Sequence, residues 1–358
     1  MLMINYRIRL KKVRRAFIKA GVDSFLVTKP ENIFYLTGFR GDDSFLFITE
    51  HDSYIITDSR YENELRVGTH GYKVFIRDKN VSLSTVIQSL LKKKRARTVG
   101  FEPANISHYQ FKKLNKDLKV KKLKPCYRMI ENIRMIKDAS EIKLIKESVK
   151  VAEQSLKAVS NKYLSSKYKE KDVANFLEYT MKIKGAEQAS FPLIVATGKR
   201  SAFPHAVSGN TYIKSNSVLL IDFGAKRRGY CSDLTRTFFL GKITARFKRL
   251  YSLVLEAQHR AIDSIRAGVR IGSVDKGTRD FFKKAKVDQY FTHALGHGIG
   301  LEVHESPSLL CTCTDRFEED MIVTVEPGLY INNWGGIGLR IWYVLGLINV
   351  NYLPHIPL

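Results

Sequence analysis

The sequence predicts a mixed α/β protein built from two domains. A chain of 358 residues is long enough to bury two apolar cores, and 44% hydrophobic with 27% charged residues is typical of a globular protein. Helix-like and strand-like segments alternate over residues 1–132, which is the pattern of an α/β domain. Residues 133–358 combine long amphipathic helices with a hairpin and a Gly-rich segment, which indicates a second domain of α+β type.

The first domain is predicted from short segments of clear periodicity. Apolar residues at helical spacing predict a helix over residues 8–20, with Gly21 as its stop. Amphipathic helices are expected at 83–94 and 107–118, and strands at 23–28, 44–49, 53–57 and 97–102. The glycine pair Gly38 and Gly41 lacks the spacing of a phosphate loop, so we expect no nucleotide site here.

The second domain is predicted to begin with a long helix. Asp138 and Glu141 form a capping box for a helix over 139–159, whose apolar residues line one face. The next elements expected along the chain are a helix at 171–184, a buried strand at 189–197, a loop at 203–205 and helices at 246–267 and 274–286.

Residues 218–241 predict a β-hairpin that carries two carboxylates. Two apolar runs flank the polar stretch 226–229, which we expect to form the turn. With the turn centred between Arg227 and Arg228, Asp222 lies directly opposite Asp233. Opposed like charges destabilise a sheet unless a cation lies between them, so the pair is either two solvated carboxylates on an exposed hairpin or part of a metal site.

Two later segments add further candidate metal ligands. Residues 291–307 hold three histidines, His293, His297 and His304, in a Gly-rich stretch that does not suit a regular helix. Glu326 ends the apolar run 322–325 directly before Pro-Gly, and a carboxylate at the end of a buried strand needs a partner. Carboxylate and imidazole donors together suit a hard or borderline divalent ion.

Taken together, these stretches resemble those of the pita-bread metallopeptidases, and most of all aminopeptidase P and prolidase. The resemblance rests on the Asp222–Asp233 spacing, HALGHGIGLEVHE at 293–305, VEPGLYI at 325–331 and GGIGLRI at 335–341. The stretch ENIFYLTGF at 31–39 also resembles a creatinase-type N-terminal domain. The resemblance implies a creatinase-type domain over 1–132, a pita-bread catalytic domain over 133–358 and a metal-dependent Xaa-Pro aminopeptidase. Its substrate would be a peptide with proline at the second position.

The resemblance also implies a role for each matching residue. Asp222 would ligate one metal ion, Asp233 would bridge two, and His297 would ligate the other. Glu326 would be a ligand close to the attacking water and a candidate general base. The remaining implied catalytic residues are His205, His293 and His304, which would assist at the substrate, and Arg340, which matches the arginine just before the family's last ligand. Two divalent ions would share a hydroxide; Mn²⁺ is expected, with Co²⁺ and Zn²⁺ as alternatives.

One position departs from the family pattern. Where the family has a glutamate that bridges both ions, two residues after Arg340, this chain has Trp342. Alternation along a strand would place the indole on the same face as Arg340. Residues 342–358 contain no Asp, Glu, Lys or Arg and differ in composition from the rest of the chain. A natural apolar tail and a reading-frame change near residue 342 both explain this, and impaired peptidase activity is expected either way.

Composition limits the other possibilities. The net charge of +25 comes from Lys and Arg spread along the chain, which favours a solvated basic surface, so we do not expect a nucleic-acid partner. No apolar run is long enough for a membrane span, no secretory signal is evident, and four scattered cysteines fit a reducing cytoplasm. The family implies a homodimer. Prolidase and a non-catalytic pita-bread binding protein remain as alternative functions.

Overall fold

The chain folds into two compact units of mixed helices and sheets, which confirms the predicted fold class. The computed structural model describes residues 4–67, 71–94 and 97–346. The units divide between Arg134 and Met135. No helix in these ranges is both long enough and apolar enough to cross a membrane.

The first unit is a six-stranded sheet with helices packed on it. The strand order is β4-β3-β2-β1-β5-β6, with β1–β2 and β2–β3 antiparallel and the other pairs parallel. The strands are β1 (Ser24–Val27), β2 (Phe45–Thr49), β3 (Ser53–Asp58), β4 (Lys73–Arg77), β5 (Thr98–Phe101) and β6 (Lys122–Pro125). The helices are α1 (Tyr6–Lys19), α2 (Pro30–Thr37), α3 (Glu62–Val67), α4 (Leu83–Lys94), α5 (His108–Asp117) and α6 (Met129–Met135), with 3₁₀ turns at Ser59–Tyr61 and Pro103–Asn105.

The three helices predicted in the first unit are confirmed. The short helices α3 and α6 were not predicted, and neither was α2. Its signals are Pro30 in the first turn and Gly38 in the left-handed conformation at the C-cap, with φ of 77°. Its eight residues are too few for helical periodicity to stand out, so only these end signals distinguish it.

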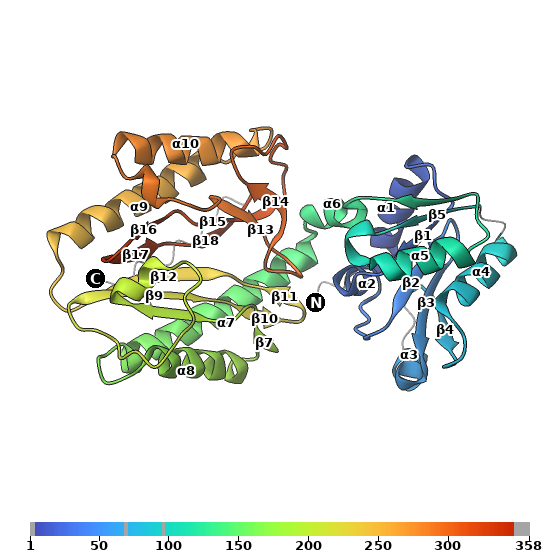
Figure 1. The fold of residues 1–358 in the computed structure, drawn as a ribbon, viewed down its shortest axis with the longest axis horizontal. Coiled ribbons are helices and arrows are strands. Elements are labelled where there is room, and N and C mark those ends of the chain that lie inside the picture. The colour runs from blue at the N-terminus through green and yellow to red at the C-terminus, as the bar shows by residue number, and fades with distance from the viewer. Residues whose placement is uncertain (1–3, 68–70, 95–96, 347–358) are drawn as a thin grey trace. The chain divides into compact units, whose positions relative to one another are not determined.

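In the described part of the second unit, helices lie on both sides of the strands. Figure 1 shows α9 and α10 on one side of the strands and α7 and α8 on the other. The capping box predicted at Asp138 and Glu141 is present at the start of α7. The helices are α7 (Ala139–Tyr163), α8 (Glu170–Ile183), α9 (Ala245–Ser264) and α10 (Ile271–Lys284), with 3₁₀ turns at Gly198–Ala202 and Asp288–Tyr290.

The strands of the second unit form several small antiparallel sheets, in the orders β12-β9-β8, β11-β10-β7, β14-β13-β15-β18 and β16-β17. They are β7 (Gln188–Ala189), β8 (Ile194–Thr197), β9 (Ser217–Phe223), β10 (Ala225–Arg227), β11 (Tyr230–Cys231), β12 (Leu234–Leu240), β13 (Gly296–Gly298), β14 (Glu305–Leu309), β15 (Ile322–Val325), β16 (Gly328–Ile331), β17 (Gly335–Gly338) and β18 (Ile341–Val344).

The single buried strand predicted at 189–197 was wrong. The segment forms two strands, β7 and β8, which belong to different sheets. Pro192 lies between them and has no N–H to continue a ladder, so the chain can leave one sheet and enter the next.

The hairpin is confirmed, but its predicted register was wrong. Thr235, not Asp233, lies opposite Asp222 on the neighbouring strand, because the turn is centred between Arg228 and Gly229. These two residues have φ of 49° and 85°, as a two-residue turn with positive φ at both positions requires. The shift moves each cross-strand partner by two residues. Asp233 therefore stays on the same face as Asp222 but lies diagonal to it.

The end of the chain is only partly described. Trp342 lies in β18, which pairs with β15, so the last strand of this sheet forms despite the unusual sequence. Most of the compositionally unusual tail predicted at 342–358, from residue 347 onward, lies outside the described residues.

Candidate metal centre

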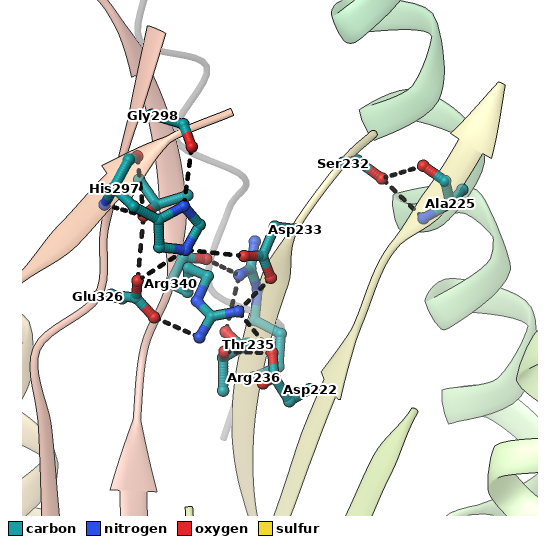
Figure 2. A network of polar contacts seen from close by, with 11 residues as sticks. Asp222, Ala225, Ser232, Asp233, Thr235, Arg236, His297, Gly298, Glu326 and Arg340 are labelled. Carbon is teal, nitrogen blue, oxygen red and sulfur yellow. Dashed lines mark hydrogen bonds and ion pairs between the residues drawn. The ribbon is translucent and has the colours of Figure 1, made fainter. Parts of the chain in front are cut away.

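The four predicted metal ligands come together in the second unit. Asp222 lies in β9, Asp233 directly before β12, His297 in β13 and Glu326 directly after β15. Figure 2 shows them around one point, with the guanidinium of Arg340 between them. Asp233 is fully buried, and Asp222 and Glu326 are 9% and 8% exposed, so their charges are largely removed from water. We call these five side chains, Asp222, Asp233, His297, Glu326 and Arg340, the acid cluster.

A close approach of two strands places His297 beside Glu326. A Cβ on Gly296 would lie 2.0 Å from the backbone oxygen of Thr324, so only glycine lets β13 come this near to β15. The hydroxyl of Thr324 then accepts from the His297 N–H at 3.0 Å and donates to Glu326 Oε1 at 3.1 Å. The Gly-rich composition around His297 is therefore needed for packing at this point of the site.

Thr235 joins the two sheets that carry the acid cluster. Its hydroxyl donates to Asp222 Oδ1 at 2.7 Å, and its backbone forms a bridge with Arg340, whose N–H donates to the Thr235 oxygen at 3.2 Å. Gln258 of α9 supports the same region, since its amide donates to the oxygens of Val325 and Leu339 at 2.9 and 2.8 Å. No sequence signal distinguishes these three residues, because single polar residues are common in both strands and helices.

The acid cluster has two halves. In the His half the carboxylate oxygens face His297, and in the Arg half they face Arg340. In the His half, His297 Nε2 lies 3.3 Å from Asp233 Oδ2 and 3.1 Å from Glu326 Oε1. His297 Nε2 and Asp233 Oδ2 are buried, and neither makes a hydrogen bond of good geometry. His297 Nδ1 lies 2.9 Å from the oxygen of Gly298, which fixes the ring so that Nε2 faces the carboxylates.

The Arg half contains the guanidinium of Arg340. Its Nη1 donates to Asp222 Oδ1 at 3.1 Å and to Asp233 Oδ1, and its Nη2 pairs with Glu326 Oε2. One guanidinium thus contacts all three carboxylates of the cluster. Arg340 is itself held by its backbone: its oxygen accepts from Arg236 Nη1 at 2.9 Å.

Burial and charge pull the pKa values in the acid cluster in different directions. Burial lowers the pKa of His297, but Asp233 and Glu326 outweigh it and raise the value to about 9. Burial raises the pKa of Asp222, and the charge of Arg340 offsets this only in part. For Glu326 the charges of Arg340 and His297 outweigh burial and lower the pKa. The carboxylates hold the pKa of Arg340 well above its ordinary value despite burial.

The predicted outer residues lie in different places. His293 is half-buried, its Nδ1 lies 2.7 Å from the oxygen of Ala294, and its Nε2 is buried without a hydrogen bond. His304 is exposed, with its ring 4.4 Å from that of His297. Burial lowers the pKa of both rings. His205 is exposed on the loop after the 3₁₀ turn at 198–202, and among the described residues it makes no polar contact with the acid cluster.

Trp342 occupies the face of β18 that belongs to the site. It lies opposite Thr324 in the β15–β18 ladder, and directly opposed residues project to the same face. Its neighbours Ile341 and Tyr343 pack against the apolar core on the other face. The register thus puts an indole, rather than a carboxylate, on the side of the sheet where Thr324 contacts Glu326.

The two halves of the acid cluster differ in which donor atoms are already engaged. In the described part of the chain, no three His, Cys, Asp or Glu side chains are already arranged to hold an ion. In the His half, however, two buried donor atoms lack hydrogen bonds and a third lies 3.1 Å away, so small side-chain movements would suffice. In the Arg half, the carboxylate oxygens already bind the guanidinium.

Comparison with known proteins identifies relatives of the whole chain. Residues 143–344 match metallopeptidase family M24, and residues 9–136 match the creatinase/prolidase N-terminal domain. An Xaa-Pro dipeptidase of Pyrococcus furiosus is 30% identical, with 93% of each chain covered. Two solved structures are also similar. One is an Xaa-Pro dipeptidase from Bacillus anthracis (TM-score 0.91, 32% identity, 95% of both chains), and the other an X-Pro aminopeptidase from Thermotoga maritima (0.84, 33%, 92% of this chain and 95% of that one).

Proposed function

This chain belongs to metallopeptidase family M24, with a creatinase/prolidase N-terminal domain, and we propose that it is a metal-dependent Xaa-Pro aminopeptidase with impaired turnover. The observation that carries the proposal is the convergence of Asp222, Asp233, His297 and Glu326, from four separate strands, into one buried cluster. Buried carboxylates are costly without a cation, so a site that gathers three of them is built to hold positive charge.

In the proposed site, each residue of the chain has a distinct task. Asp233, His297 and Glu326 would hold a divalent ion in the His half, and a bound ion would supply Lewis-acid activation of water and of the scissile carbonyl. Glu326, which the charges around it keep ionised, would accept a proton from the attacking water. His293 Nε2, buried and without a hydrogen bond, is free to bind a substrate oxygen.

Trp342 is the reason that we propose impaired turnover. Without a carboxylate at this position, the Arg half has one acidic ligand fewer and its remaining oxygens bind Arg340. If the Arg half holds no ion, the attacking water would be positioned by one ion instead of two.

Prolidase is a second candidate, because similar solved structures include an Xaa-Pro dipeptidase as well as an X-Pro aminopeptidase. The two activities differ in whether the substrate extends beyond proline. Mn²⁺ is the ion that we propose, since the site is rich in carboxylates. We further propose a homodimer and a cytoplasmic location, and the four free cysteines are in keeping with a reducing compartment.

Peptide hydrolysis tests the proposed function. The chain is assayed with Mn²⁺ on Ala-Pro, Ala-Pro-Ala and Ala-Ala-Ala, together with Trp342→Glu and with Asp233→Asn as the inactive control. We expect slow cleavage of Ala-Pro-Ala, faster cleavage by Trp342→Glu and none of Ala-Ala-Ala. Cleavage of Ala-Pro alone would select prolidase. If neither the folded chain nor folded Trp342→Glu cleaves a proline peptide, the proposal is wrong.

A further inference from the structure

The Arg half of the acid cluster has the composition of a cation site that is already filled. Three carboxylate oxygens, from Asp222, Asp233 and Glu326, converge on a single guanidinium. The Arg340 side chain is only 15% exposed, so water contributes little to its solvation and the carboxylates supply nearly all of it.

The opposite oxygens of the same carboxylates face the His half. Asp233 uses Oδ1 toward Arg340 and Oδ2 toward His297, and Glu326 uses Oε2 and Oε1 in the same way. The two carboxylates thus bridge two cation positions, of which one holds a guanidinium. The other position has two buried donor atoms without hydrogen bonds.

We infer that Arg340 acts as a built-in cation in this chain and that the site takes one divalent ion, in the His half, instead of two. The inference rests on the proposed function, which assigns the His half to a metal ion. What is new is that the site takes one ion and that Arg340 occupies the second cation position.

Charge balance supports this assignment. When all three carboxylates are ionised they carry three negative charges, and one divalent ion with one guanidinium neutralises them. Two divalent ions with the guanidinium would leave two uncompensated positive charges in a buried site, which is unfavourable. A fourth carboxylate at position 342 would change the balance, but the face opposite Thr324 carries an indole instead.

The geometry also explains why Arg340 can reach the carboxylates. Its backbone is fixed by the bridge to Thr235, which places the start of its side chain beside β9 and β12. Thr235 at the same time holds Asp222 through its hydroxyl. Arg340 and the acid it neutralises are therefore positioned by one residue, and the contact does not depend on a flexible loop.

Counting bound ions tests the inference. Mn²⁺ is titrated by calorimetry into the full chain after dialysis against EDTA, and free Mn²⁺ is measured independently by electron paramagnetic resonance. Three variants accompany the wild type. Arg340→Met removes the charge at similar length, and Arg340→Lys keeps a charge. Arg260→Met is the control, because Arg260 is exposed on α9, where it pairs with Glu256 and lies over the Phe281 ring, and neither contact involves the acid cluster.

We expect one ion per chain for the wild type, Arg340→Lys and Arg260→Met, and two for Arg340→Met. Binding of two ions or none by the wild type would overturn the inference, as would one ion in a folded Arg340→Met. If Arg340→Met does not fold, the wild type and Arg340→Lys still decide, because both keep a cation in the Arg half and two ions in either contradicts the inference. The titration measures no turnover, so it can fail or succeed independently of the proposed peptidase activity.

Discussion

Replacing Arg340 by methionine should strongly destabilise the metal-free protein. The change leaves the carboxylates of Asp222, Asp233 and Glu326 buried without the guanidinium that contacts all three. At about 3 Å and an effective dielectric constant of about 20, one such contact is worth roughly 5 kcal/mol before desolvation is subtracted. Removing one partner of a buried ion pair costs about 3–5 kcal/mol in measured cases. We therefore expect a loss of about 4 kcal/mol.

This loss can be measured on the second unit alone. Both tryptophans of the chain, Trp334 and Trp342, lie in that unit, so tryptophan fluorescence follows its unfolding without a contribution from the first. For a domain of about 200 residues, 4 kcal/mol corresponds to a fall of roughly 8–16 °C in melting temperature. The measurement is made in EDTA at pH 7.

The control for this prediction is Arg260→Met, which removes an exposed arginine, its ion pair with Glu256 and its cation–π contact with Phe281. Exposed contacts of these two kinds contribute about 0.5 kcal/mol each, so the control should melt within about 4 °C of the wild type. Saturating Mn²⁺ should restore most of the stability of Arg340→Met, because it replaces the missing positive charge. If Arg340→Met and the control have the same melting temperature in EDTA, the guanidinium does not stabilise the acid cluster.

Three further predictions concern the residues that build the site. Because the pKa of His297 is raised to about 9, its protonation stabilises the metal-free fold fully below pH 6.5, and this stability is lost as pH rises through 9. Urea unfolding in EDTA should therefore show the free energy of unfolding falling by up to roughly 3 kcal/mol over this range, and His297→Gln should abolish the fall. Gln258→Ala leaves the buried oxygens of Val325 and Leu339 without their donor and should cost about 2–3 kcal/mol in urea unfolding; a cost under about 1 kcal/mol would mean that water replaces the amide. Gly296→Ala puts a Cβ 2.0 Å from the backbone oxygen of Thr324, so β13 and β15 must separate and Mn²⁺ affinity should fall at least tenfold. Unchanged affinity would show that the strands can separate without disturbing the site.

Much of the site could be predicted from the sequence, because its residues stand at characteristic places in strong local patterns. Asp222 and Asp233 flank a hairpin turn, His297 lies in a Gly-rich stretch, and Glu326 interrupts an apolar strand before Pro-Gly. The structure brings these four together. The sequence pattern also placed Trp342 on the site face, in agreement with its position opposite Thr324.

What could not be predicted depends on register and on contacts between distant strands. The hairpin turn was misplaced because the stretch 226–229 offers several turn positions, and only the positive φ of Arg228 and Gly229 selects one. The resemblance to the family implied only that Arg340 is one of the catalytic residues. It could not show that the guanidinium contacts all three carboxylates, because that contact depends on how β12, β15 and β18 meet.

We propose that Asp222, Asp233, His297 and Glu326 form, with the guanidinium of Arg340, a site for a single divalent ion. Anomalous diffraction at the manganese edge, from crystals of the full chain soaked in Mn²⁺, tests this most directly. We expect one peak per chain, between Asp233, His297 and Glu326, with Arg340 still bound to Asp222. Two peaks, or a peak anywhere else with these side chains apart, would contradict the account.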